Sequence, residues 1–167
     1  MNIVSFSFFR TPCPRRRAVE YYTQHWPALF RHFPEVYPGW RMRWHVDERE
    51  VDLVAPCLEG LDFVDIEIMP RTDHMSVGHL WRAKPCWDPD VEYCAQNDCD
   101  AVPAPREALC RQEFLDTGYD AHVIRDSPDH TGQMMCGLCC WRAAAVRELW
   151  PTWDAFIADH ERHDRFY

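Results

Sequence analysis

The stretch VEYCAQNDCDAVPAPREA, residues 91–108, places a short apolar run before two aspartates, Asp98 and Asp100, and a proline-rich turn after them. We expect residues 91–96 to form a buried strand. Side chains two positions apart on a strand share a face and lie about 7 Å apart, so both carboxylates can converge on one cation where the strand ends. A divalent ion held by one or two carboxylates keeps open positions for phosphate oxygens. The pair therefore indicates either a metal and diphosphate site or, more simply, a solvated turn.

The chain on either side alternates predicted strands with predicted helices. Strands are expected over residues 3–9, 40–46, 63–68 and 121–125, where β-branched and aromatic residues are frequent. Helices are expected over residues 18–33, 51–58, 77–84, 105–116, 141–149 and 152–162, with Pro27 kinking or dividing the first and residues 34–39 ending it. This order predicts one α/β domain over residues 1–167 with a mostly parallel sheet. Ligands of such sheets bind beyond the carboxyl ends of the strands, where Asp47, Asp98 and Asp100 fall.

Longer motifs around the two aspartates resemble a known family. These motifs are RMRWHVDE (41–48), LWRAKPCWDPDVEYCAQNDCDAVPAPRE (80–107) and HVIRDSPDHTGQMMCGLCCWR (122–142). Together they resemble the small metal-dependent glycosyltransferases of the GT-A nucleotide-diphospho-sugar transferase fold, which carry an Asp-x-Asp motif. The matching positions are Trp81, Arg82, Pro85, Asp88, Asp98, Asp100, Arg106, Glu107, Arg125, Asp126, Pro128, His130 and Gly137.

The resemblance implies a GT-A-like, Rossmann-like sheet flanked by helices, in a compact or C-terminally shortened form. It implies an enzyme that moves a hexosyl or deoxyhexosyl group from a UDP- or GDP-sugar to a glycan or protein acceptor. Asp98 and Asp100 would hold Mn²⁺ or Mg²⁺, with Asp100 as the direct ligand, and the ion would stabilise the departing diphosphate. The donor-binding candidates are Ser5, Phe6, Asp47, Arg82, Lys84 and Asp98, and the catalytic candidates are Asp126 and His130.

Several of these residues also have a plain structural interpretation. Phe6 fits core packing, and Arg82 and Lys84 fit a solvated helix face. Asp126 fits a turn cap beside a loop that His130 orders. The family's Gly-Gly-x-Trp-Gly block reads CGLCC at residues 136–140 here, which also fits a non-catalytic nucleotide-sugar-binding domain.

The nine cysteines raise a further alternative, a cysteine-rich zinc-binding interaction module. Cys136 and Cys139 have the spacing of a zinc or redox pair. A structural zinc site needs a second pair at similar spacing, which the other cysteines do not form. We therefore expect buried or half-buried free thiols.

Composition limits the partners. A net charge of −9 weighs against nucleic acid, because phosphate binding needs a basic face. No apolar run approaches the roughly 18–20 residues of a membrane-spanning helix. The apolar N-terminus NIVSFSFF lacks the basic segment and cleavage site of a signal peptide. We expect a soluble, cytoplasmic protein without a nucleic-acid partner or membrane span, and the sequence carries no signal for its oligomeric state.

Overall fold

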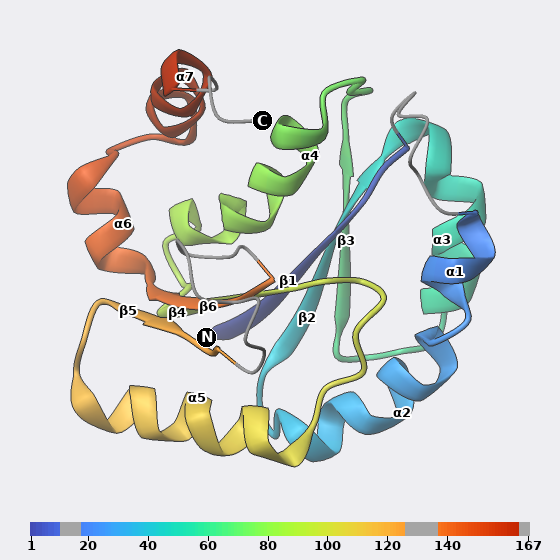
Figure 1. The fold of residues 1–167 in the computed structure, drawn as a ribbon, viewed down its shortest axis with the longest axis horizontal. Coiled ribbons are helices and arrows are strands. Elements are labelled where there is room, and N and C mark those ends of the chain that lie inside the picture. The colour runs from blue at the N-terminus through green and yellow to red at the C-terminus, as the bar shows by residue number, and fades with distance from the viewer. Residues whose placement is uncertain (11–17, 126–136, 164–167) are drawn as a thin grey trace.

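The computed structural model describes residues 1–10, 18–125 and 137–163, which carry a six-stranded sheet in the order β3-β2-β1-β4-β6-β5 (Figure 1). Its strands are β1 (Asn2–Phe8), β2 (Arg41–Asp47), β3 (Val64–Met69), β4 (Tyr93–Asn97), β5 (Ala121–Val123) and β6 (Leu138–Arg142). Strands β1 to β4 run parallel to one another, whereas β6 is antiparallel to both β4 and β5. The predicted mostly parallel α/β sheet is confirmed.

Helices cover both faces of this sheet (Figure 1). The α-helices are α1 (Val19–Thr23), α2 (Trp26–Val36), α3 (Val51–Leu58), α4 (Met75–Leu80), α5 (Pro105–Thr117), α6 (Ala143–Leu149) and α7 (Trp153–His163), and the 3-10 helices are η1 (Glu48–Glu50) and η2 (Trp81–Trp87). Among the described residues, no helix is both long and apolar enough to cross a membrane.

The core has two main parts because alternate side chains of a strand point to opposite faces. On one face, buried side chains of β1 and β2 pack against α2, α3 and α5, and Phe6 stacks on Trp44 with ring centroids 5.2 Å apart. On the other face, Ile3 of β1 packs with Cys86 of η2 and Val146 of α6. The central strands β1 and β4 are therefore buried on both sides.

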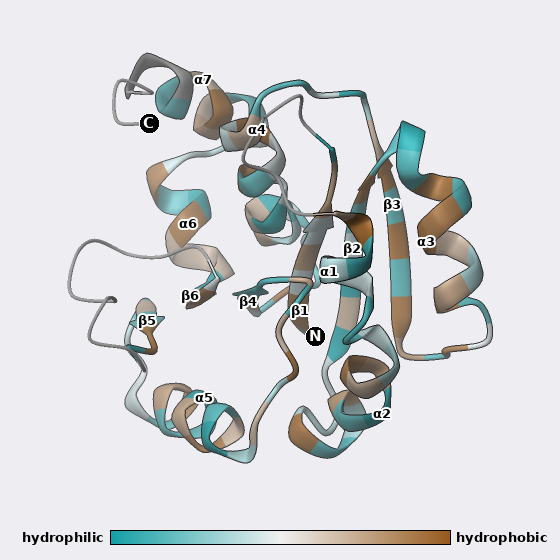
Figure 2. Ribbon diagram, turned by 45° about the vertical axis from the view of Figure 1, so that its right-hand side comes forward, coloured by the Kyte–Doolittle hydropathy of each residue, from teal (hydrophilic) through white to brown (hydrophobic). Residues whose placement is uncertain are grey.

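Strand β3 is an edge of the sheet and alternates hydrophobic with charged residues (Figure 2). Ile66 and Ile68 pair in register with Trp44 and Val46 of β2, which places them on the face that α3 covers. They are 39% and 60% exposed, so α3 covers this edge incompletely.

Several predicted helix boundaries were wrong. The helix expected over 18–33 divides into α1 and α2, with Pro27 in the first turn of α2, but α2 then continues through Pro34 to Val36. The helix expected over 77–84 is α4, which ends at Leu80, followed by the 3-10 helix η2. The helix expected over 141–149 begins only at Ala143 as α6. Its first two expected residues, 141 and 142, belong to strand β6, which spans residues 138–142.

Candidate active site

The candidate site lies where parallel strands β1, β2 and β4 reach their carboxyl ends, at Phe8, Asp47 and Asn97. After Asn97 the chain turns, and the Ala101 N–H donates to the Asp98 carbonyl oxygen at 3.2 Å. Cys99 packs against the main core, and burial raises the pKa of its thiol to about 12. The Trp26 indole N–H holds the same residue by donating to its carbonyl oxygen at 2.9 Å. With Cys99 facing inward, the two flanking aspartates are left at the surface of the turn.

Asp98 is held between η2 and the start of β6. Arg82, only 4% exposed, places Nη1 2.5 Å from Asp98 Oδ1 and donates from the same nitrogen to the Asn97 carbonyl oxygen at 3.2 Å. On the opposite side, a Cβ added at Gly137 would lie 2.2 Å from Asp98 Oδ2. The Asp98 side chain is still 55% exposed. It is therefore fixed in direction and open to solvent.

Asp100 is half-buried and has no hydrogen-bond or ion-pair partner among the residues that the structure describes. An unpaired carboxylate is the better ligand, because binding an ion breaks no existing contact. The described side chains contain no cluster of three or more His, Cys, Asp or Glu groups placed to hold a metal ion. The carboxylates of Asp98 and Asp100, the second without a described partner, nevertheless fit a divalent ion that prefers oxygen ligands. Such an ion would take its remaining ligands from phosphates and water.

Arg82 was predicted to meet the donor phosphates, and in the structure its guanidinium donates to the Asp98 carboxylate. Lys84 was predicted to do the same. Its ammonium pairs with the Glu67 carboxylate on β3, and burial lowers the pKa of Lys84. Lys84 therefore binds an acid on the protein's own sheet, and we leave it out of the proposed site.

Ser5 and Phe6 were predicted to contact the nucleotide, but both are completely buried. The Ser5 hydroxyl lies 3.2 Å from Nδ1 of His45, and Phe6 belongs to the core. Direct contact with a ligand requires exposed surface, which neither side chain has, so we leave both out of the proposed site.

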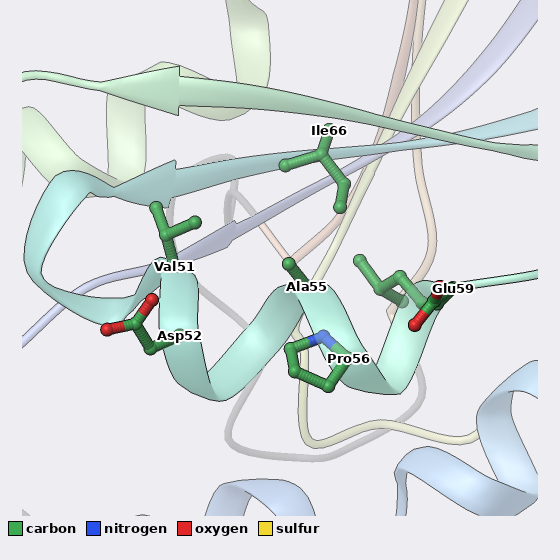
Figure 3. Close-up of a pocket in the computed structure, with 7 residues that line it drawn as sticks. Val51, Asp52, Ala55, Pro56, Glu59 and Ile66 are labelled. Carbon is green, nitrogen blue, oxygen red and sulfur yellow. The ribbon is translucent and has the colours of Figure 1, made fainter.

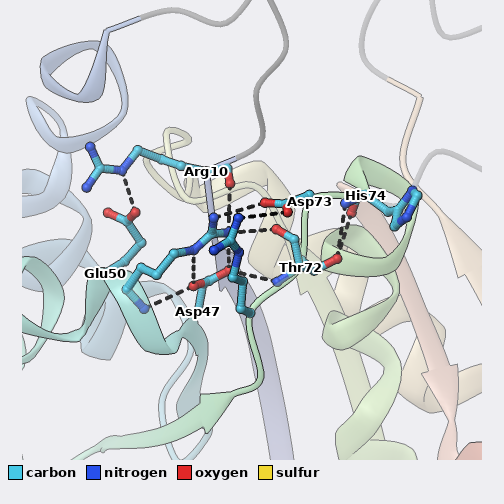
Figure 4. Close-up of polar contacts among 8 residues, drawn as sticks. Arg10, Asp47, Glu50, Thr72, Asp73 and His74 are labelled. Atoms are coloured by element: carbon cyan, nitrogen blue, oxygen red, sulfur yellow. Dashed lines mark hydrogen bonds and ion pairs between the residues drawn. The ribbon is translucent and has the colours of Figure 1, made fainter.

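Asp47, another predicted nucleotide contact, is also completely buried and belongs to a network at the ends of three strands (Figure 4). Its carboxylate accepts two hydrogen bonds from the Arg49 guanidinium, at 2.8 and 2.7 Å, and one from the Thr72 N–H at 3.1 Å. Nη2 of Arg49 also donates to the carbonyl oxygens of Arg10 and Thr72, at 3.0 and 2.7 Å. We call Asp47, Arg49 and these two carbonyls the Arg49 staple. A nucleotide could reach Asp47 only if Arg49 moved away.

Asp126, His130 and Cys136 lie outside the described residues, so their predicted roles remain predictions. Four of the described cysteines, Cys86, Cys94, Cys139 and Cys140, are buried. Cys139 and Cys140 belong to β6 and pair in register with β4, so these positions of the altered glycine block build the sheet.

A groove of about 450 Å³ lies between α3 and β3 (Figure 3). Its lining is apolar apart from two acids, Asp52 and Glu59. Acidic side chains without a cation repel a diphosphate, so this groove is a poor candidate for the donor site. The carboxylate pair after β4 remains the better candidate.

No family model and no curated protein matches the sequence. Among solved structures, the fold is similar to that of 4-diphosphocytidyl-2C-methyl-D-erythritol synthase from Anaerococcus prevotii. The TM-score is 0.58 at 11% sequence identity, and the match covers 92% of this chain and 76% of that chain. The two chains share a Rossmann-like fold. At this identity the likeness concerns the fold alone, and it supports the expected Rossmann-like α/β architecture.

Sequence reasoning missed three features of the site. It gave no structural role to Gly137, whose missing side chain makes room for Asp98. It gave none to Arg49, whose guanidinium donates to the Asp47 carboxylate. It also gave none to Glu107, which contacts the residue immediately before Asp98. The only available signal was that Gly137 and Glu107 both belong to the motifs that carry the family resemblance.

Proposed function

We propose that this chain is a metal-dependent glycosyltransferase that moves a sugar from a UDP- or GDP-sugar to a glycan or protein acceptor. One observation carries the proposal: the turn after β4 presents one carboxylate fixed by Arg82 and Gly137 beside a second carboxylate without a described partner. A solvated turn would not need a buried arginine and a closely packed glycine to orient one of its aspartates. The motifs that surround the pair, and their order along the chain, support the same function.

In this proposal Asp98 and Asp100 hold Mn²⁺ or Mg²⁺, which when bound supplies Lewis-acid stabilisation of the diphosphate leaving group. Asp100 serves as the direct ligand because its carboxylate has no competing described cation. Asp98 already shares its charge with Arg82, so it contributes its second oxygen or acts through water. Arg82 then acts by orienting Asp98 and limiting the negative charge that the two aspartates bring together.

The fold likeness supports a nucleotide linked through a diphosphate. The name of the similar synthase describes a diphosphocytidyl compound, and in Rossmann-like sheets ligands bind beyond the carboxyl ends of the strands. Asp98 and Asp100 lie at that edge. For the acceptor side we propose Asp126 as the general base and His130 as its neighbour in the pocket, on the family resemblance alone.

Calorimetric titration of metal-stripped protein with UDP and with GDP, with and without Mn²⁺, tests the donor site. We expect binding of one nucleotide that requires Mn²⁺ and weakens more than about tenfold in Asp100→Asn. Asp52→Asn is the matched control, because it removes one negative charge from an exposed position on α3. It should bind as wild type does.

The outcomes separate the competing functions. If neither nucleotide binds under any metal, the donor site is wrong and the aspartates form a solvated turn. If binding is metal-dependent but no donor sugar is transferred or hydrolysed, the chain is a non-catalytic nucleotide-sugar-binding domain.

A further inference from the structure

The end of β4 is held from α5 as well as from η2. Asn97, the last residue of β4, is only 2% exposed. Its side-chain amide donates from Nδ2 to Glu107 Oε1 at 2.6 Å, and its Oδ1 accepts from Nη2 of Arg111 at 3.4 Å. Both partners lie on α5, Glu107 in its first turn and Arg111 one turn later. The side-chain amide of Asn97, the residue immediately before Asp98, is therefore held by α5, whereas Arg82 comes from η2.

Glu107 is itself fixed. The Tyr37 hydroxyl donates to the same Oε1 atom, and Tyr37 is only 2% exposed. Burial and the neighbouring Glu107 carboxylate raise the pKa of Tyr37, so the phenol stays protonated and keeps donating. Arg111 is also 2% exposed and adds a positive charge beside the carboxylate. Glu107 thus joins the end of α2, the start of α5 and the end of β4.

Two independent contacts act on Asn97, one on its backbone and one on its side chain. Arg82 binds the carbonyl oxygen of the peptide that leads into Asp98, and Glu107 binds the side chain. Rotation about the bonds of Asn97 and Asp98 determines where both aspartates point. A rotation of the Asn97 backbone that redirects the following turn would break a charge-assisted hydrogen bond to Arg82 or to Glu107.

We propose that Glu107 is a positioning residue for the metal carboxylates, acting through Asn97 and touching neither the ion nor the nucleotide. The inference rests on the proposed function and deepens it. Side chains that orient metal ligands typically contribute about 10–100-fold to metal affinity. Loss of Glu107 should therefore weaken Mn²⁺ binding without removing a ligand.

The test measures Mn²⁺ affinity by electron paramagnetic resonance, alone and with saturating UDP or GDP, together with the melting temperature. We expect Glu107→Ala and Asn97→Ala each to weaken Mn²⁺ binding about 10–100-fold. Glu107→Gln keeps an acceptor oxygen at the same place and should recover most of the loss. Thr117→Ala is the matched control, because it removes the Thr117 hydroxyl bond to the Phe114 carbonyl at the other end of α5. It should lower the melting temperature and leave Mn²⁺ affinity unchanged.

The results separate this inference from the proposed function. Wild-type protein that binds neither Mn²⁺ nor nucleotide overturns both. Wild-type binding with unchanged affinity in Glu107→Ala overturns the positioning role alone. Equal weakening in Thr117→Ala would also overturn it, since general loosening of α5 would then explain the effect. If Glu107→Ala does not fold, Asn97→Ala and Glu107→Gln decide the question.

Discussion

At the scale of single residues, Asp98 and Asp100 differ in their surroundings although only Cys99 separates them. Asp98 contacts a buried guanidinium on one side and the Gly137 backbone on the other, whereas Asp100 has no described partner. Packing therefore determines the direction of Asp98, and a bound ligand can determine that of Asp100. The two carboxylates should respond differently to changes in the surrounding protein.

Gly137→Ala tests the packing of Asp98. The new Cβ would lie 2.2 Å from Oδ2 and 2.8 Å from Cγ of Asp98, so the carboxylate must move. Because over half of the Asp98 side chain is exposed, it can swing into solvent and the fold should survive. We expect Mn²⁺-dependent nucleotide binding to weaken by more than about tenfold, as measured by calorimetry, with an unchanged circular dichroism spectrum.

Gly118→Ala is the control for this substitution. Gly118 follows α5 with φ of 69°, and an added Cβ would have no neighbour within 4 Å. Alanine there strains the backbone and should lower the melting temperature while leaving nucleotide binding unchanged. Wild-type binding by Gly137→Ala would show that Asp98 does not depend on this contact.

At the scale of elements, local signals predicted α5 well and missed β6. Helix α5 was predicted over 105–116 and spans Pro105–Thr117, because a proline in the first turn and a glycine after the last are local features. Strand β6 is defined by its pairing with β4, for example Ala95 with Cys140. A run of five residues carries too little periodicity to separate strand from helix, so that pairing could not be predicted.

The same distinction applies to the candidate site. Asp98 and Asp100 could be found because their spacing and the end of their strand are both local. The roles of Arg82 and Asp47 could not be found, because their partners come from other elements. Arg82 lies on η2 and meets Asp98 after β4, and Asp47 accepts from Thr72 after β3. The sequence indicated that charged side chains gather at this edge of the sheet. Which of them form ion pairs depends on the fold.

Arg49→Met tests the Arg49 staple, which joins the ends of β1, β2 and β3. Burial alone would raise the pKa of Asp47, but hydrogen bonds from Arg49 and Thr72 outweigh it, and the pKa is lowered. Removing the guanidinium leaves a completely buried carboxylate without its cation. We expect the free energy of unfolding to fall by about 3 kcal/mol, as measured by urea denaturation at neutral pH.

The double variant Asp47→Asn/Arg49→Met supplies the control. It removes the buried charge together with its partner, and the carboxamide that replaces the carboxylate can still accept from the Thr72 N–H. It should be more stable than Arg49→Met alone by at least about 1 kcal/mol. If the double variant loses as much free energy of unfolding as Asp47→Asn and Arg49→Met lose together, the two side chains act independently.

At the scale of the whole molecule, the pH dependence of stability should reflect one buried histidine. Burial is the main cause that lowers the pKa of His45 to about 3, although Glu67 lies 3.2 Å from its Nε2. The unfolded chain has an ordinary histidine pKa of about 6.5 and takes up a proton first. The stabilising effect is therefore complete above about pH 6.5 and is lost as the pH falls from there towards 3.

The expected loss from His45 alone is about 1.4 kcal/mol between pH 7.5 and pH 5.5. Burial also lowers the pKa of His122, which adds a loss of the same sign. Urea denaturation at both pH values, compared with His45→Gln, isolates the first contribution. The variant should lose about 1.4 kcal/mol less than wild type over this interval. An identical loss in both proteins would mean that His45 is protonated in the folded chain.

The Arg49 staple has a consequence for how the sequence can change over evolutionary time. Arg49 binds carbonyl oxygens at residues 10 and 72, which every amino acid possesses, and two side-chain carboxylates, the buried one of Asp47 and the exposed one of Asp73. Substitutions at 10 and 72 leave those bonds intact, whereas a change at 47 or 49 alone leaves the other residue without its partner in the Asp47–Arg49 ion pair. Among relatives of this chain, positions 47 and 49 should vary together, and positions 10 and 72 should drift independently of them.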